Sequence, residues 1–328
     1  MRLRTLSLGI LLAGTVYSET YYRTFFHNHP VKQRIRQGEV VSTKTVDASG
    51  KDLTGEVVTE RGNPLTGPFY VEGAEPGDAV LIRFHKMRLN RNWGYSGYRL
   101  GLFTITPEYV DQKNYPPIFK EEKTKSGIAR FVKWDIDIEK GLVRLSEPAS
   151  KAVSLEFPVK PMLGCLGVAA AGDWAPTSGP AGAYGGNMDY NRVGEGVVVI
   201  LPVFHPGALV FMGDGHALQG DGEPTGTGVE TSMDVEFSVT VRKNAKLTGP
   251  RLETADSIIS IGSQPEFQSS LDRALELATT DMVQYLMNDY GLEEWAAHLL
   301  ISFQGKYEVV TARGSMALVI PKSALRKK

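Results

Sequence analysis

Short runs of β-branched and apolar residues, separated by turn-forming residues, make up residues 33–159. Residues 40–46, 79–84 and 128–132 are runs of this kind, and residues 142–145 alternate apolar and polar side chains with a period of two. Gly and Pro between the runs, as in residues 62–64, are typical of turns. No helical period of useful length appears, so this part is predicted to form β-strands.

A Gly-dense stretch follows at residues 164–230. Residues 196–203 and 208–212 are continuous apolar runs, which predict strands buried on both faces. Residues 234–241 alternate Val or Phe with polar side chains, which predicts a half-exposed strand.

A long helical period appears near the C-terminus. Apolar side chains recur there at spacings of three and four, at Leu271, Leu275, Ala278, Met282, Tyr285 and Leu286. Gly291 suits a left-handed C-cap, so this helix is expected to end near residue 290. A shorter helix is predicted at 293–303, and strands at 306–311 and 316–320. The sequence thus predicts a mainly β fold with a C-terminal helix pair (α+β), in which the helices pack against the sheets and carry no chemistry.

Length and charge narrow the class of protein. The 328 residues allow one large domain or two intimate ones, and we expect residues 19–328 to form a single domain. The 36 basic and 37 acidic residues give a net charge of −1, which excludes a broad basic surface for nucleic acid. No nucleic-acid or membrane partner is expected. Cys165 is the single cysteine, so no intrachain disulfide can form, and its apolar neighbours predict a buried, inert thiol.

Residues 1–18 have the order of a secretory signal peptide. Arg2 and Arg4 precede a short apolar run at 6–13, and Val16 and Ser18 suit the recognition positions of a cut after Ser18. The run is too short to span a bilayer, which takes about 20 apolar residues. We therefore expect export to the periplasm or the extracellular space. The alternative is a buried N-terminal strand or helix of a cytosolic protein.

Carboxylate, amide and imidazole side chains gather in two Gly-framed blocks, at residues 185–189 and 213–223. Such a mixed set suits Zn²⁺ or another divalent ion that activates water. Asp214 and His216 are two residues apart, so both side chains point to the same side of an extended segment. As alternatives, Asp214 and Asp221 could make Asx turns, and the His could be an ordinary core residue. The density of mutually repelling carboxylates favours a site.

Motifs of other enzyme classes are missing from the sequence. It contains no Gly-x-Ser-x-Gly nucleophile elbow and no Gly-x-x-x-x-Gly-Lys-Ser/Thr phosphate loop. Its Gly pairs do not follow a strand and open a helix, as a dinucleotide fingerprint would.

The two blocks resemble the acetamidase/formamidase family. The matching segments are residues 185–189, 201–203, 207–209, 213–217, 219–223 and 226–230, and upstream residues 46–50, 63–68 and 73–78. With the helix pair, the resemblance covers about residues 25–321. It implies a β-sandwich architecture, one catalytic domain, and metal-dependent hydrolysis of a formamide- or acetamide-like linear amide to a carboxylate and ammonia, with Zn²⁺ as the expected ion.

The expected metal ligands are Asp189, Asp214 and His216, with Asp47 and His27 as additional candidates. Asp47 lies in a turn that matches the family, whereas His27 lies in a segment that matches it only loosely.

The remaining roles concern the proton and the substrate. Glu223 is expected to take the proton of water and to pass it to the leaving ammonia, because its Gly neighbours leave the carboxylate unobstructed. Asn187 is expected to donate to the developing oxyanion. Gly186 and Gln219 are expected to contact the substrate.

An aromatic-rich segment departs from the family pattern and leaves alternatives open. Residues 86–125 have no counterpart that we can place, and they contain Trp93, Tyr95, Tyr98, Tyr109 and Tyr115. A cyclic amide (lactam) hydrolase on the same scaffold is one alternative. A secreted, non-catalytic metal- or carbohydrate-binding module is another, since aromatic faces stack on sugars. A homodimer is left open as the assembly.

Export can be tested on the protein expressed with its native N-terminus. The mature chain should begin near Glu19, because the predicted cut follows Ser18. N-terminal mass spectrometry checks this, and finding Met1 on the mature cytosolic protein would refute it.

Overall fold

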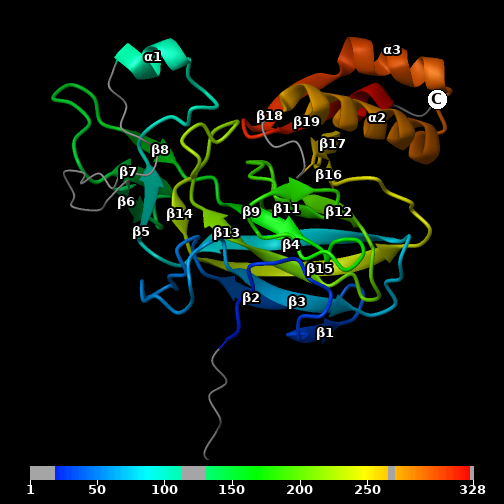
Figure 1. Cartoon of the computed structure of the whole chain (residues 1–328), viewed down its shortest axis with the longest axis horizontal. Helices are drawn as coiled ribbons and strands as arrows, with labels where there is room; N and C mark the ends of the chain where they lie inside the picture. Colours follow the sequence, from blue (N-terminus) through cyan, green and yellow to red (C-terminus); the bar gives the residue numbers. More distant parts are fainter. Residues whose placement is uncertain (1–18, 113–130, 265–269, 326–328) are drawn as a thin grey trace, which may run out of the picture.

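Figure 1 shows a computed structural model, which describes residues 19–112, 131–264 and 270–325. The predicted signal peptide lies outside the described residues, and so do residues 128–130 of one predicted strand and residues 113–125 of the aromatic-rich segment. The helices are α1 (Pro107–Gln112), α2 (Leu271–Tyr290), α3 (Glu294–Gln304) and the 3₁₀ turn η1 (Lys322–Leu325). The strands are β1 (Gln33–Ile35), β2 (Val41–Thr45), β3 (Leu65–Val71), β4 (Ala79–Leu89), β5 (Trp93–Gly97), β6 (Phe131–Asp137), β7 (Leu142–Leu145), β8 (Glu156–Pro158), β9 (Met162–Gly167), β10 (Ala181–Gly182), β11 (Gly185–Asn187), β12 (Val198–Pro202), β13 (Val210–His216), β14 (Glu230–Thr231), β15 (Met233–Arg242), β16 (Arg251–Glu253), β17 (Ser257–Ser263), β18 (Lys306–Thr311) and β19 (Ser315–Pro321).

Two sheets carry these strands, and all strand pairs except β1–β3 are antiparallel. The larger sheet has 11 strands in the order β10-β11-β9-β13-β14-β5-β6-β7-β8, with β3 beside β13 and β1 beside β3. The smaller has eight strands in the order β18-β19-β17-β16-β12-β4-β15-β2. The prediction of a mainly β fold with C-terminal helices is confirmed.

One apolar core is shared by both sheets. Phe69 of β3 and Phe237 of β15 meet edge to face across it, with ring centroids 5.1 Å apart. The strands predicted to be buried on both faces, now β12 and β13, are buried almost throughout. Cys165 of β9 is buried in this core, as predicted, and burial raises the pKa of its thiol well above the ordinary value.

The strand β13 differs from its prediction at both ends. Ala208 and Leu209 have left-handed backbones (φ 57° and 61°), which delay the start of the strand to Val210. The strand then continues through residues 213–216, four residues beyond its predicted end at residue 212. The two glycines there serve close packing: a Cβ on Gly213 would lie 2.4 Å from the carbonyl oxygen of Pro64. Asp214 and His216 therefore belong to a strand of the larger sheet, in agreement with the extended segment expected for them.

The helix pair packs against the smaller sheet, as predicted. The side chain of Ser270 accepts a hydrogen bond from the Arg273 amide at the start of α2, and Gly291 ends that helix in a left-handed C-cap (φ 67°). Ala278, Met282, Tyr285 and Leu286 of the predicted stripe are buried, whereas Leu275 is exposed and the neighbouring Ala274 is buried instead. Helix α2 lies along β17 and β19 (Figure 1).

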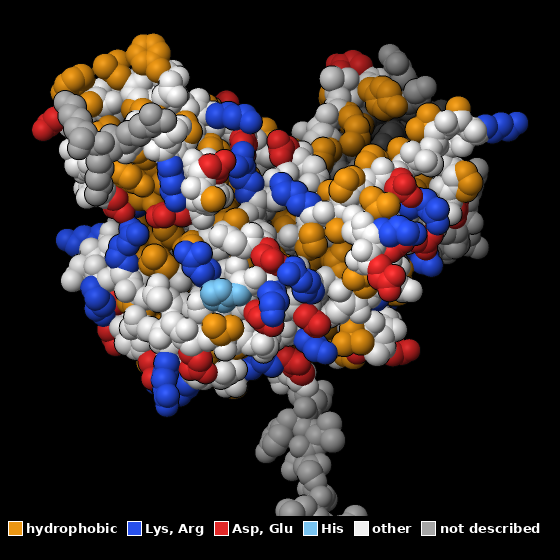
Figure 2. Space-filling view, turned by 180° about the vertical axis from the view of Figure 1, so that it is seen from behind, with side chains coloured by type: hydrophobic (Ala, Val, Ile, Leu, Met, Phe, Trp, Pro, Cys, Tyr) orange, Lys and Arg blue, Asp and Glu red, His pale blue; other side chains and the backbone are white. Residues whose placement is uncertain are grey.

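Two further features were not predicted. A short helix, α1, lies in the region where no helical period was found. The outer face of α3 exposes Trp295, Leu299 and Phe303 at spacings of four, and Figure 2 shows hydrophobic side chains gathered at the helical end of the molecule. Among the described residues, no helix is both long enough and apolar enough to cross a bilayer.

The contact of α2 with β17 gives a test of the fold. A Cβ on Gly262 would lie 1.9 Å from the carbonyl oxygen of Ala274 and 2.7 Å from the amide nitrogen of Ala278. Gly262→Ala should therefore push the helix away and lower the free energy of unfolding by about 1–3 kcal/mol. Gly249→Ala is the control, because its Cβ would meet its nearest neighbour at 3.5 Å. Chemical denaturation of both variants measures the effect, and equal stabilities would contradict this packing.

Candidate metal centre

Four strands of the larger sheet bring a set of ionisable side chains together. Asp214 and His216 belong to β13, and Glu230 of β14 pairs directly with His216 in the sheet register. Asp189 follows β11 and is fixed to β9, because its amide donates to the carbonyl of Gly164 at 3.0 Å. The imidazole Nε2 of His216 lies 3.5 Å from Asp214 Oδ1 and 3.1 Å from Glu230 Oε1.

In this cluster, one polar atom of each side chain is held and another is free. Asn187 donates to Asp189 Oδ2 (2.7 Å), Asn63 donates to Asp214 Oδ2 (3.2 Å), and the Gly228 amide donates to Glu230 Oε1 (3.1 Å). The partner atoms Asp189 Oδ1, Asp214 Oδ1 and Glu230 Oε2 are buried and have no hydrogen-bond partner. Buried polar atoms are rarely left unpaired, so these oxygens are arranged for something absent from the protein itself.

His216 follows the same rule. Its Nδ1 lies 2.7 Å from Gln219 Oε1. An amide oxygen can only accept a hydrogen bond, so Nδ1 is the donor and carries a proton. Its Nε2 has no hydrogen-bond partner and faces the carboxylates of Asp214 and Glu230. The amide nitrogen of Gln219 donates in turn to the carbonyl oxygen of Asp189 at 2.6 Å. A histidine oriented through its second nitrogen is the usual arrangement of a metal ligand.

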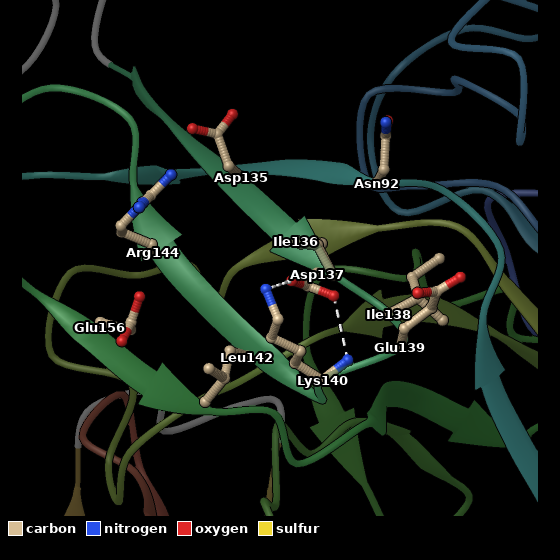
Figure 3. Close-up of a pocket in the computed structure, with 10 residues that line it drawn as sticks. All are labelled: Asn92, Asp135, Ile136, Asp137, Ile138, Glu139, Lys140, Leu142, Arg144 and Glu156. Atoms are coloured by element: carbon tan, nitrogen blue, oxygen red, sulfur yellow. Dashed lines mark hydrogen bonds and ion pairs between the residues drawn. The ribbon is translucent and has the colours of Figure 1, made fainter.

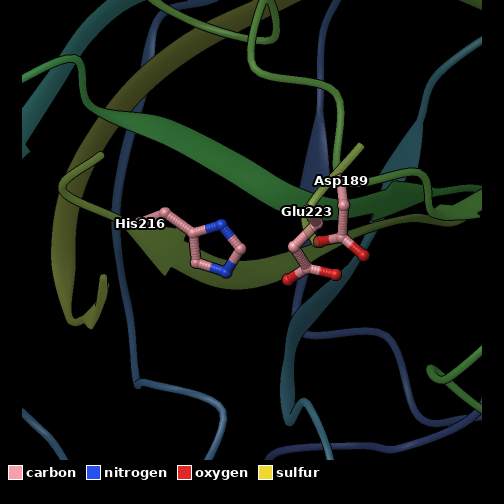
Figure 4. Close-up of side chains that lie close together, drawn as sticks. All are labelled: Asp189, His216 and Glu223. Carbon is pink, nitrogen blue, oxygen red and sulfur yellow. The ribbon is translucent and has the colours of Figure 1, made fainter. Parts of the chain in front are cut away.

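Glu223 belongs to the loop between β13 and β14, and its side chain reaches the cluster from there. Figure 4 shows its carboxylate beside that of Asp189, with the imidazole of His216 directed toward the pair. Two sets of potential ligand atoms result, Asp189–His216–Glu223 and Asp214–His216–Glu230, and within each set the atoms lie within 4.8 Å of one another. Since His216 has one free nitrogen, both sets depend on that same atom.

Glycines make room for these side chains. A Cβ on Gly164 would lie 2.4 Å from Asp189 Oδ1 and 2.8 Å from Asp214 Oδ2. A Cβ on Gly228 would lie 2.5 Å from the ring of His216. Any larger residue at either position would therefore displace the ligand atoms.

The backbone is unusual at the same residues. Asp189, Asp214 and Glu223 have left-handed φ angles of 49°, 58° and 46°. This conformation is uncommon for residues with a side chain, and it clusters at functional sites.

Burial and mutual repulsion disturb the protonation of the carboxyl groups. Burial raises the pKa of Glu223 to about 7 and that of Glu230 to about 8. Burial, together with the Glu223 and Asp214 carboxylates, holds the pKa of Asp189 well above its ordinary value. Burial alone would lower the pKa of His216, but the Glu230 and Asp214 carboxylates outweigh it and the pKa is raised. The cluster thus holds more negative charge than its surroundings can stabilise.

A pocket of about 480 Å³ opens onto the cluster. Its buried floor includes Asp214, Glu223 and Glu230. Arg313 and the exposed side of Arg23 line it as well, together with Ala48, Gly62, Asn63, Thr177, Ser178, Gly179, Asn187, Gly226 and Thr227. A substrate can therefore reach the carboxylates from solvent.

Two of the predicted ligands lie elsewhere. Asp47 is fully buried in an ion pair with Arg91 (Oδ2 to Nη2, 2.8 Å), and its other oxygen accepts from the amides of Ser49 and Lys51. His27 stacks on His205, with ring centroids 4.3 Å apart. Neither belongs to the two sets of ligand atoms.

The residues predicted to contact substrate or oxyanion have other partners in the structure. Gln219 holds His216 and does not line the pocket. Gly186 is packed among backbone atoms, where a Cβ would lie 2.6 Å from the carbonyl oxygen of Pro180. Asn187 lines the pocket, and one of its two amide hydrogens is used on Asp189. Glu223, predicted to be unobstructed, is only 6% exposed.

Sequence reasoning assigned no role to Glu230, Asn63 or Gly164. Glu230 and Asn63 stood within segments that match the family, which was the available signal. Gly164 becomes visible only when β9 is placed behind Asp189 and Asp214, because its role is to lack a side chain.

A second hollow, of about 570 Å³, lies on strands β6 and β7 (Figure 3). Asp135, Asp137, Glu139, Lys140 and Arg144 are among its lining residues. Its charges are exposed and partly paired: Lys140 donates its amide to Asp137 and forms an ion pair with it at 3.0 Å. It contains none of the buried, unpartnered atoms found at Asp189, Asp214, His216 and Glu230.

The chain and its structure are similar to several known proteins. The chain is 25% identical over 256 residues to a putative formamidase of Schizosaccharomyces pombe, a match that covers 66% of this chain and 62% of the relative. The structure is similar to that of an acetamidase from Yersinia enterocolitica (27% identity, TM-score 0.75), over 94% of this chain and 90% of that one. It is also similar to a predicted acetamidase/formamidase from Thermoanaerobacter tengcongensis (28% identity, TM-score 0.74), over 93% and 94%.

The match to the curated relative thus spans less than two thirds of that protein's length. A family model, in contrast, matches nearly the whole chain in two overlapping parts, residues 18–178 and 156–323. The chain belongs to the Acetamidase/Formamidase family.

Proposed function

We propose that the protein is a metal-dependent amidase that hydrolyses the C–N bond of a small linear amide. The observation that carries the proposal is the convergence of buried, unpartnered atoms of Asp189, Asp214, His216 and Glu230 at one end of an open pocket. Membership of the family supports the reaction class.

The donor set suits a divalent cation. Asp189, Asp214 and His216 would hold it, with Glu230 or Glu223 as a further ligand. A hydrogen bond to another atom of the side chain orients each of Asp189, Asp214, His216 and Glu230. One imidazole and several carboxylates suit Zn²⁺, the ion expected from the sequence, and also Mn²⁺. When bound, such an ion supplies Lewis acidity, which polarises an amide carbonyl and acidifies water.

Glu223 is the residue we propose for proton transfer. Its carboxylate lies on the pocket floor beside Asp189, and its pKa of about 7 is near the value that favours both accepting and donating a proton. It takes a proton from the attacking water and gives it to the nitrogen as the C–N bond breaks. The carboxylic acid and ammonia formed in this way exchange one proton, so the final products are a carboxylate and an ammonium ion, and atoms and charges balance. The second amide hydrogen of Asn187 is available to the carbonyl oxygen as that oxygen gains charge.

Metal dependence is the first test. The purified protein should contain close to one divalent ion or more per chain, and a chelator should abolish ammonia release until metal is restored. His216→Ala should lower the metal content, since it removes the free Nε2. His298→Ala, an exposed histidine on α3, is the matched control. Elemental analysis that finds no metal in an active preparation would reject the proposal.

Glu223→Gln tests the proton-transfer role. The substitution keeps the shape and removes the proton acceptor, so turnover should fall by about 10²–10⁴-fold. The melting temperature should not fall, because a neutral amide avoids the cost of burying a charged carboxylate, which is the main cause of the raised pKa of this group. Metal content should stay unchanged.

Other results have other meanings. Loss of metal together with activity would make Glu223 a ligand, and unchanged turnover would remove it from the mechanism. Glu139→Gln, in the second hollow, is the control and should retain full turnover.

A further inference from the structure

The pocket is much larger than the smallest amides require. Its volume of about 480 Å³ lies in the range of pockets that hold drug-sized ligands, roughly 300–1,000 Å³. Formamide and acetamide take up little more space than a few water molecules, each of about 30 Å³. Space therefore remains for a longer acyl group once the amide lies against the carboxylate cluster.

Charge is divided between the floor and the rim of this pocket. Asp214, Glu223 and Glu230 on the floor are buried, whereas Arg313 is exposed at the rim. Arg23 also lines the pocket, but it is already paired with Glu60. No ion pair within 4 Å joins Arg313 to a carboxylate of the described residues, and its charge opposes the rise in the pKa of Glu223 on the floor of the same pocket.

The backbone and side chain of Arg313 are held in place. It lies in the turn between β18 and β19, and the neighbouring amide of Ala312 donates to the carbonyl oxygen of Gly222 at 2.8 Å. Its guanidinium stands over the ring of Phe103, 5.1 Å from the centroid, and close to Gly226. A cation fixed to the loop that carries Glu223 is thus presented to whatever occupies the pocket.

We infer that the preferred substrate is an amide whose acyl group ends in a carboxylate, and that Arg313 recognises this carboxylate. This inference rests on the proposed amidase function. Hydrolysis requires the amide end to lie at the floor beside Glu223, so the other end of the acyl group extends toward Arg313 at the rim. Guanidinium groups bind carboxylates through two parallel hydrogen bonds, which also fixes the orientation of the substrate. The substrate class is therefore the monoamide of a short dicarboxylic acid.

The test compares succinamate with its neutral isostere succinamide, with formamide as a further substrate, in the metal-loaded enzyme. We expect kcat/KM to be about tenfold higher for succinamate, a value between those of exposed ion pairs and buried charged hydrogen bonds. The preference should weaken at high salt, because the guanidinium is exposed. Arg313→Gln should abolish the preference and Arg313→Lys should keep part of it. Arg61→Gln removes the same charge from a nearby exposed position that does not line the pocket, and it should leave the preference intact.

A binding measurement separates this inference from the proposed function. Calorimetry with succinate, which has no amide to hydrolyse, should show binding to the wild type and about tenfold weaker binding to Arg313→Gln. Release of ammonia from neutral amides, with no succinamate preference and no Arg313-dependent binding of succinate, would overturn the inference and leave the amidase function standing. No ammonia from any amide would reject the amidase function, and equal succinate binding by both proteins would reject the role of Arg313.

Discussion

Four carboxyl groups and one imidazole are buried within a few ångströms of one another, and much of the surrounding structure exists to hold them there. Burying a charge away from water costs several kcal/mol unless the charge is compensated. In this protein the compensation is incomplete. Amide groups of Asn63, Asn187 and Gly228 each donate to one oxygen of a carboxyl group in the cluster and leave its second oxygen without a hydrogen bond. The raised pKa values of Glu223 and Glu230 express the remaining imbalance. A divalent cation relieves this kind of imbalance.

Uncommon backbone conformations and glycines without a side chain both help to position the cluster. The left-handed conformations of Asp189, Asp214 and Glu223 turn three carboxylates inward from three different elements. Such conformations persist only where the surrounding structure over-determines them. Here, β13 is enclosed between β9 and β3, so Asp214 cannot relax without disturbing two neighbouring strands.

Much of the fold could be predicted from local patterns, and the site only in part. The period of three and four residues and Gly291 located α2 and its end, because these signals are local. The end of β13 was misjudged, since the glycines that usually mark a loop here allow close strand packing. Asp189, Asp214, His216 and Glu223 stood in Gly-framed blocks and were predicted together. Glu230 contacts His216 through a strand pairing that no single segment reveals.

Asp47 shows the opposite limit. Its residue type and its family-like turn suggested a ligand, but the carboxylate is engaged by Arg91, which lies far along the chain and stacks on Trp93. An acidic residue is available as a ligand only if no basic side chain pairs with it in the folded protein. Local sequence does not show which residues pair in this way.

The loop that carries Glu223 contacts the turn between β18 and β19, and this contact affects the order in which the cluster assembles during synthesis. Gly222 forms a bridge with Thr311 and accepts a hydrogen bond from Ala312, although almost ninety residues separate them in the chain. Proteins are made from the N-terminus, and the strands that carry Asp189, Asp214 and His216 leave the ribosome well before this turn. The four-carboxyl cluster is therefore completed late, after the C-terminal hairpin has emerged and docked. A nascent or truncated chain could hold the first ligands in place while still lacking the loop geometry that positions Glu223.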